Sequence, residues 1–303
     1  MDTQKFYSHG KLLITGEYLV LDGAKALAIP CKFGQHLNVI PSEKDTSRWL
    51  SYDHQNRLWL DIEFDLLQVI KTTWKGNNDI ENRLFQVFRE INRLNPTVFT
   101  QNYQFKTHLE FPKTWGLGTS STLIANLAKW ADVNPYALLA NTFGGSGYDI
   151  ACADSDAALV FQLEKGEPQV ETAEIPEAIK SYIHFVYLEE KQNSREAIAN
   201  YKTTRPNGLE KFISEINKIT QDFQNVESLE MAQELIDSHE QCLSEILQIK
   251  PVQSRLFPDF KGHIKSLGAW GGDFVMVLSE KDPTHYFRNK GLNTILSFED
   301  MSL

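Results

Sequence analysis

One run of residues has the types and spacing needed to hold a phosphate group, and it reads Trp115-Gly116-Leu117-Gly118-Thr119-Ser120-Ser121. We call it the phosphate loop. It leads directly into an apolar segment of helical character, 122–128. Glycines let the main chain approach an anion closely, and the N–H groups of a first helical turn point at the ligand. The hydroxyl groups of Thr119, Ser120 and Ser121 could equally be ordinary helix caps. The loop alone therefore leaves two interpretations open, a phosphate cradle and a capped helix start.

Two further glycine-rich segments lie near the ends of the chain. The N-terminal glycine segment, 10–23, begins Gly-Lys-Leu-Leu-Ile-Thr-Gly-Glu-Tyr, and the C-terminal glycine segment, 266–273, ends Gly-Ala-Trp-Gly-Gly-Asp. A turn, Ser146-Gly147-Tyr148-Asp149, stands between the phosphate loop and the C-terminal segment. In this order the set resembles the GHMP kinases, the superfamily of galactokinase, homoserine kinase, mevalonate kinase and phosphomevalonate kinase. The resemblance covers nearly the whole chain.

The resemblance implies an α+β fold with two lobes. The N-terminal lobe would be ribosomal-protein-S5-domain-2-like and the C-terminal lobe ferredoxin-like. It also implies ATP and Mg²⁺ as cofactors. The cofactor would be bound by the residues of the phosphate loop, namely Gly116, Leu117, Gly118, Thr119, Ser120 and Ser121.

Lys11 is a charged residue at the start of an apolar run. It could be an exposed lysine at the beginning of a strand. The resemblance instead makes it catalytic, with its point charge near the transferred phosphoryl group. Glu17 and Tyr18 follow in the same segment and are expected to face the substrate or to shape its pocket, although packing is an equal alternative for Tyr18.

Asp149 is the second catalytic candidate, because the resemblance places the aspartate of this turn beside the phosphate acceptor. It would act as a general base or as an electrostatic partner of the lysine. An aspartate after Gly-Tyr can also cap a helix, and the small residues that follow fit a helix start. Ser146 and Gly147 are expected to contact the substrate with it.

The magnesium site departs from the pattern of mevalonate kinases. Those enzymes carry an acidic magnesium ligand before the turn, whereas this chain has no acidic residue between Asp132 and Asp149. Magnesium would then rest on Ser120, the phosphate oxygens and water, which suits an ion that keeps much of its hydration shell.

The C-terminal glycine segment is expected to contribute Gly271, Gly272 and Asp273 to substrate binding. The glycine pair could also be a hairpin turn before a strand, and Asp273 a local cap. Arg195, at the start of a helix, is expected to pair with a carboxylate or phosphate of the acceptor, with plain exposure as the alternative.

Both terminal glycine segments resemble those of the phosphomevalonate branch of the superfamily, and this resemblance implies phosphomevalonate as the acceptor. Mevalonate, homoserine and an ATP-dependent decarboxylation of the same superfamily are alternatives. A catalytically silent regulator that binds nucleotide or metabolite is another, from a different class.

The composition argues against nucleic acid and membranes as partners, which leaves small molecules. The 303-residue chain has a net charge of -10 and no basic stripe, so nucleic acid is not an expected partner. Its apolar runs are shorter than the roughly 18 residues that span a bilayer, so neither a membrane nor a site outside the cytoplasm is expected. Three scattered cysteines suit a reducing compartment. The protein is expected to be a monomer or a homodimer.

Periodicity and turn residues predict the main elements. Two domains are expected, 1–175 as the nucleotide-binding lobe and 176–303 as the second lobe, divided near the acidic stretch 174–177. Strands are expected in an antiparallel sheet over 12–21, 33–40, 49–62, 103–111 and 157–163, and in the second lobe over 183–188 and 274–278. Helices are expected over 80–94, 119–131, 135–143, 209–223 and 229–247, with one opening at 194–195.

Overall fold

The computed structural model describes residues 2–190, 194–206, 208–270 and 272–303, with the side chains of 194 and 195 outside the description. The chain forms two compact units that interleave along the sequence. Unit 1 holds the chain up to Gly10, Phe33–Lys113 and Gly118–Asp154, and unit 2 holds Lys11–Lys32, Thr114–Leu117 and Ser155–Leu303. The expected domains 1–175 and 176–303 describe consecutive segments, and their boundary stays a prediction.

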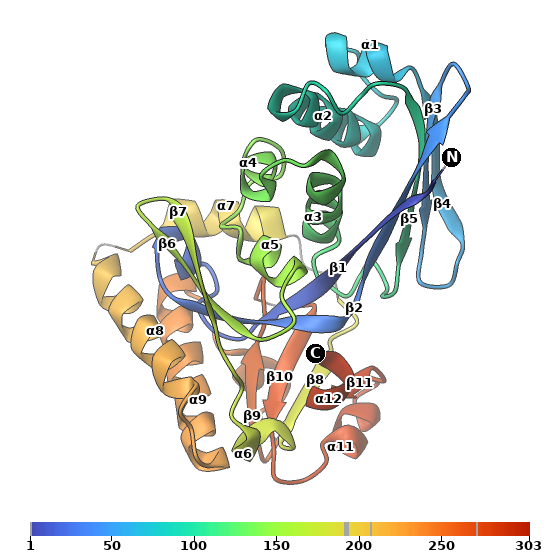
Figure 1. Cartoon of the computed structure of the whole chain (residues 1–303). Helices are drawn as coiled ribbons and strands as arrows, with labels where there is room; N and C mark the ends of the chain where they lie inside the picture. Colours follow the sequence, from blue (N-terminus) through green and yellow to red (C-terminus); the bar gives the residue numbers. More distant parts are fainter. Residues whose placement is uncertain (1, 191–193, 207, 271) are drawn as a thin grey trace. The chain divides into compact units, whose positions relative to one another are not determined.

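Unit 1 is built on a mixed sheet with helices on one face (Figure 1). The strand order is β4-β3-β5-β2, and β1 pairs with β2. Both β1 and β2 continue into unit 2. Its strands are β1 (Gln4–Leu13), β2 (Ala26–Ser42), β3 (Ser47–Tyr52), β4 (Leu58–Phe64) and β5 (Asn102–Leu109). Its helices are α1 (Leu66–Lys71), α2 (Asp79–Leu94), α3 (Thr119–Ala131), α4 (Pro135–Ala140) and α5 (Tyr148–Ala153).

The core of unit 1 lies between the sheet and these helices. Trp49 stacks on Phe105 with ring centroids 5.4 Å apart, and Phe88 of α2 meets the Phe105 ring at 5.2 Å. Asn78 caps α2 by accepting hydrogen bonds from the N–H groups of Ile80 and Glu81, which satisfies donors that a helix start leaves open.

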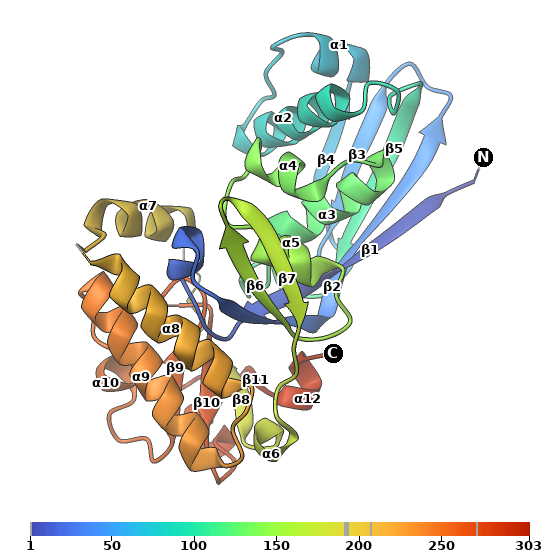
Figure 2. The same ribbon diagram turned by 60° about the vertical axis from the view of Figure 1, so that its left-hand side comes forward.

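Unit 2 contains a second, antiparallel sheet of order β11-β8-β10-β9, on which α9 packs (Figure 2). The first part of β2 also pairs with β6, and β6 with β7. Its strands are β6 (Leu159–Glu164), β7 (Glu167–Thr172), β8 (Ile183–Tyr187), β9 (His263–Ser266), β10 (Phe274–Leu278) and β11 (Ile295–Ser297). Its helices are the 3-10 helix η1 (Leu19–Asp22), α6 (Glu177–Lys180), α7 (Ser194–Thr204), α8 (Leu209–Phe223), α9 (Leu229–Leu247), α10 (Val252–Leu256), α11 (Thr284–Asn289) and α12 (Phe298–Met301).

The α+β class is confirmed, and three local predictions are wrong. The strand expected over 12–21 ends at Leu13, because Gly16 and Tyr18 take left-handed φ values of 89° and 61° that an extended strand does not allow. The strand expected over 49–62 is a hairpin of β3 and β4, turned by Asp53, whose carboxylate accepts from the N–H groups of Gln55 and Arg57.

The third wrong prediction concerns strand direction in unit 1. The sheet was expected to be antiparallel, but β3 pairs with β5 in parallel, with Trp49 opposite Phe105. Helix α2, which connects β4 to β5, provides the crossover that parallel neighbours need. Strand β7, which follows the turn at Gly166, had no counterpart in the sequence analysis.

No helix in the described part of the chain is long and apolar enough to cross a membrane.

Candidate functional site

The first half of the phosphate loop lies in unit 2, where β1 holds it. The Lys11 N–H donates to the Leu117 carbonyl at 3.0 Å, and the Lys11 Nζ donates to the Gly116 carbonyl at 3.1 Å. The lysine that the sequence singled out therefore contacts the loop through both its backbone and its ammonium group.

Gly116 is a position where a side chain does not fit. Its φ is 68°, and an added Cβ would stand 2.5 Å from the carboxylate of Asp273. The aspartate itself has a left-handed φ of 56°. Its backbone is fixed, because its N–H donates to the Glu190 carbonyl at 2.6 Å and its carbonyl accepts from the Leu188 N–H at 2.8 Å. Three separate predictions, Lys11, Gly116 and Asp273, thus meet in unit 2.

Trp115 anchors the same turn on the sheet of unit 2. Its ring meets Phe274 edge to face with centroids 5.4 Å apart, and Tyr187 lies next to Phe274 at 5.4 Å. Leu117 is fully buried. The apolar packing of Trp115 and Leu117 restricts the backbone of the loop before any ligand binds.

The second half of the phosphate loop starts α3 in unit 1. Gly118 is the N-cap residue with a φ of 92°, and no side chain in the described part of the chain caps the helix. The Ser121 hydroxyl donates to the Gly118 carbonyl at 2.8 Å, and the Thr122 hydroxyl donates to the carboxamide oxygen of Gln35 at 2.7 Å. These hydroxyl groups bond away from the first N–H groups, while Ser120 is exposed. An uncapped first turn of this kind fits an anion. Among the described residues, no side chain makes the N-cap hydrogen bond that the alternative interpretation, an ordinary capped helix start, requires.

The turn before α5 presents Asp149 in the first turn of that helix. Gly147 is the N-cap residue with a φ of 96°, and the Asp149 Oδ1 accepts from the Ile150 N–H at 3.2 Å. Ser146 is half-buried, and a Cβ added at Gly145, whose φ is 112°, would meet no described atom within 4 Å. The contact to Ile150 is a local one, so a helix-start role and a catalytic role remain compatible for Asp149.

Glu17 and Tyr18 lie inside unit 2. Glu17 is 1% exposed and Tyr18 8% exposed. The Tyr18 ring packs on Tyr201 at 5.3 Å, and burial raises its pKa to about 12. The substrate role expected for both residues stays a prediction, since the structure gives each of them partners in the interior.

The remaining substrate candidates are only partly described. Gly271 lies outside the described residues, and Gly272 is buried just before β10. Arg195 stands in the first turn of α7, with its side chain outside the description. Their roles stay predictions.

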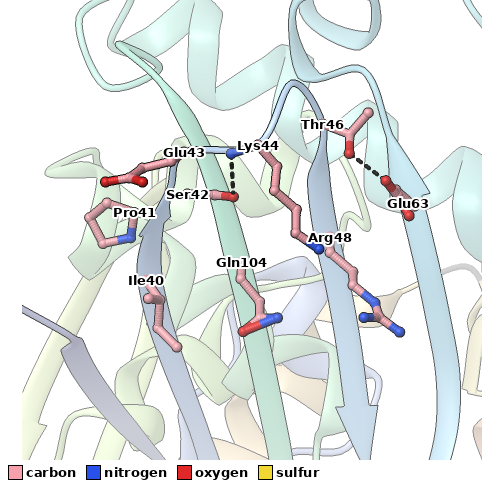
Figure 3. Close-up of a pocket in the computed structure, with 9 residues that line it drawn as sticks. All are labelled: Ile40, Pro41, Ser42, Glu43, Lys44, Thr46, Arg48, Glu63 and Gln104. Carbon is pink, nitrogen blue, oxygen red and sulfur yellow. Dashed lines mark hydrogen bonds between the residues drawn. The ribbon is translucent and has the colours of Figure 1, made fainter. Parts of the chain in front are cut away.

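A hollow of about 390 Å³ opens on unit 1 at the turn between β2 and β3 (Figure 3). Lys44 and Arg48 lie beside Gln104 there, while Thr46 donates to Glu63. Acidic and basic groups balance along its wall, and the predicted site residues do not line it. The described residues contain no group of three or more His, Cys, Asp or Glu side chains that could hold a metal ion.

No protein-family model and no curated protein matches the sequence. Solved structures do match. The mevalonate kinase of Methanococcus jannaschii has a TM-score of 0.70 at 12% identity, over 98% of this chain and 98% of that chain. Streptococcus pneumoniae phosphomevalonate kinase, in complex with phosphomevalonate and AMPPNP, has a TM-score of 0.70 at 16% identity, over 98% and 100%. Lactococcus lactis galactokinase, complexed with galactose, has a TM-score of 0.68 at 14% identity, over 95% and 88%. The chain therefore has the fold of the GHMP kinases.

Proposed function

We propose that the protein is an ATP-dependent kinase of small molecules. The observation that carries the proposal is the start of α3: Gly118, with a φ of 92°, opens a helix whose first turn lacks a side-chain cap among the described residues. Glycines that allow close approach and N–H groups without a capping side chain are what a phosphate chain requires. The shared fold with kinases supports the same function.

Lys11 and Asp149 are the residues we assign to the chemistry. The ammonium group of Lys11 would offset negative charge on the transferred phosphoryl group, where a preoriented cation acts most strongly. Lys11 already contacts the loop at Gly116, which fixes its position. Asp149 would accept the proton of a hydroxyl acceptor or pair with a cation beside a phosphate acceptor.

Magnesium would be held by Ser120 together with phosphate oxygens and water. When bound, this ion neutralises charge on the nucleotide. Ser120 fits such a role because its side chain is exposed on the first turn of α3.

Phosphomevalonate is the acceptor we propose. The support is the phosphomevalonate-type form of the two terminal glycine segments, together with the fold shared with a phosphomevalonate kinase. The acceptor contacts would come from residues of these segments, the turn before α5 and the start of α7, namely Glu17, Tyr18, Ser146, Gly147, Arg195, Gly271, Gly272 and Asp273.

A second candidate is a silent regulator of the same fold. The observation in its favour is the stretch between Asp132 and Asp149, which lacks an acidic residue that could bind magnesium. Mevalonate or homoserine phosphorylation and an ATP-dependent decarboxylation are further alternatives within the kinase fold.

The deciding experiment incubates the purified protein with ATP, Mg²⁺ and each acceptor in turn, and follows ADP release. Phosphomevalonate should give faster release than mevalonate or homoserine. Release with mevalonate alone would assign an alcohol kinase instead. Measurable ATP binding without ADP release from any acceptor would favour the regulator.

A further inference from the structure

A cluster of ionisable side chains is buried in unit 2, within and next to the two terminal glycine segments. Glu17, His239, Glu240 and Lys265 are each 3% exposed or less. They come from the N-terminal glycine segment, from α9 and from β9. Charged groups in an interior are retained only with compensating partners, so the arrangement calls for a function.

Lys265 is the centre of this cluster and is fully buried. Its Nζ pairs with the Oε1 of Glu17 and donates to the Ser266 carbonyl at 2.8 Å. Glu17 belongs to the N-terminal glycine segment, and Ser266 is the first residue of the C-terminal glycine segment. One ammonium group therefore bonds to both segments.

The turn at Glu17 has further polar anchors. The Gly16 N–H donates to the Nε2 of His239 at 3.0 Å. Burial, followed by the charge of Lys265, lowers the pKa of His239 to about 4, so the ring is neutral at pH 7. The hydrogen bond from Gly16 requires the neutral tautomer whose Nε2 carries no proton. Burial, the largest single effect, would raise the pKa of Glu17, but Lys265 and His239 together outweigh burial and hold the pKa below its ordinary value. Glu17 is thus an anion paired with Lys265.

The two segments also share apolar packing. Tyr18 and Trp270, one from each segment, belong to the same buried hydrophobic cluster. Tyr18 has a φ of 61°, a strained value for a residue with a side chain, and such strain persists only where the surroundings hold it. A polar link at Glu17 and apolar packing at the adjacent Tyr18 therefore connect the two segments.

We infer that Lys265 is a positioning residue that joins the N-terminal and C-terminal glycine segments through the interior of unit 2. It sets the backbone of Gly16–Tyr18 against that of Ser266–Trp270. The consequence for catalysis rests on the proposed kinase function, in which Lys11 of one segment takes part in the chemistry and Asp273 of the other contacts the acceptor. A small displacement of such groups lowers turnover much more than it lowers nucleotide binding.

The test compares Lys265→Met with Lys265→Gln, using Lys218→Met as a matched control at an exposed lysine of α8. Methionine replaces the chain up to Cε without the ammonium group and removes both links, whereas glutamine, one bond shorter and uncharged, keeps an N–H donor but no positive charge beside Glu17. In Lys265→Met, amide hydrogen exchange should rise about tenfold or more in both segments, 14–19 and 266–270, because each loses a buried hydrogen bond. Lys265→Gln should show a smaller rise, and Lys218→Met none.

The exchange measurement needs no substrate, so it judges the link even if the protein proves to be a regulator. Faster exchange in only one segment, or in neither, would overturn the inference. If Lys265→Met does not fold, Lys265→Gln carries the test: it must raise exchange in both segments.

A measurement of kcat then distinguishes a positioning role of Lys265 from a role in packing alone. With the acceptor that supports ADP release, Lys265→Gln should lower kcat about 10²-fold, as a misplacement near 1 Å does, with the ATP dissociation constant within about twofold of wild type. An unchanged kcat together with raised exchange would reduce the role of Lys265 to stability.

Discussion

Glu240 of α9 should make the folded protein less stable as pH rises, and its replacement by glutamine should remove that effect. The residue is 3% exposed, and neither carboxylate oxygen has a hydrogen-bond partner among the described residues. Burial raises its pKa from 4.5 to about 8, although Lys265 lowers it in part, and the charge of Glu17 raises it further. At neutral pH the folded protein therefore holds Glu240 protonated.

The magnitude follows from proton linkage. Between pH 4.5 and about 8 the unfolded chain has released this proton while the folded chain keeps it. The free energy of unfolding then falls by about 1.4 kcal/mol per pH unit. The accumulated loss is about 3 kcal/mol at pH 7 and levels off near pH 8 at roughly 5 kcal/mol. Glu240→Gln keeps the shape and carries no titrating proton, so its stability relative to wild type should rise with pH by these amounts.

The assay is native-state hydrogen exchange of the α9 amides at about pH 5, 6, 7 and 8, which reports unit 2 without requiring the whole chain to unfold in one step. Glu234→Gln, at an exposed position of the same helix, is the matched control and should show no pH-dependent difference from wild type. A stability difference for Glu240→Gln that stays constant over this range would refute the reasoning, because it would mean that Glu240 is already ionised in the folded protein at pH 5.

Three further predictions concern the proposed reaction. Gly118→Val should abolish ATP binding measured by calorimetry while circular dichroism stays unchanged, because its side chain would occupy the space of the phosphates; unchanged affinity would remove the cradle. Asp149→Asn should lower kcat about 10²-fold or more with ATP affinity nearly unchanged, as for a group that acts on the transition state; wild-type turnover would leave Asp149 as a helix-start residue. Arg195→Ala should raise KM for the phosphorylated acceptor more than it lowers kcat, since an ion-pair partner mainly contributes binding; equal KM values would exclude Arg195 from the acceptor site.

Elements with a local signal were predictable from the sequence. Helices α8 and α9 begin and end where the apolar spacing placed them, at 209–223 and 229–247, because helical periodicity is a property of neighbouring residues. The start of α3 at Thr119 was equally local, since Gly118 marks it. The parallel pairing of β3 with β5 was not predictable, because partner choice depends on the crossover through α2 and leaves no mark in either strand.

The candidate site also has a part that was predictable from the sequence and a part that was not. Lys11, Gly116 and Asp273 were each selected by their own segment, and the structure brings them together in unit 2. The proximity of Gly116 to Asp273 had no sequence signal of its own, because the two residues lie in different glycine segments and the backbone of Asp273 is fixed by Leu188 and Glu190.

Lys265 shows what kind of signal sequence reasoning missed. Its strand, β9, is buried at Ile264, Lys265 and Ser266, so a lysine there has no place in the local pattern. Glu17 is equally out of place, since the apolar run around it led to a wrong strand prediction over 12–21. Each charge alone looks like a local exception, but opposite charges inside two apolar segments satisfy each other only as a pair. An unexplained buried cation and an unexplained buried anion in one chain should therefore be tested first as partners, whatever their separation in sequence.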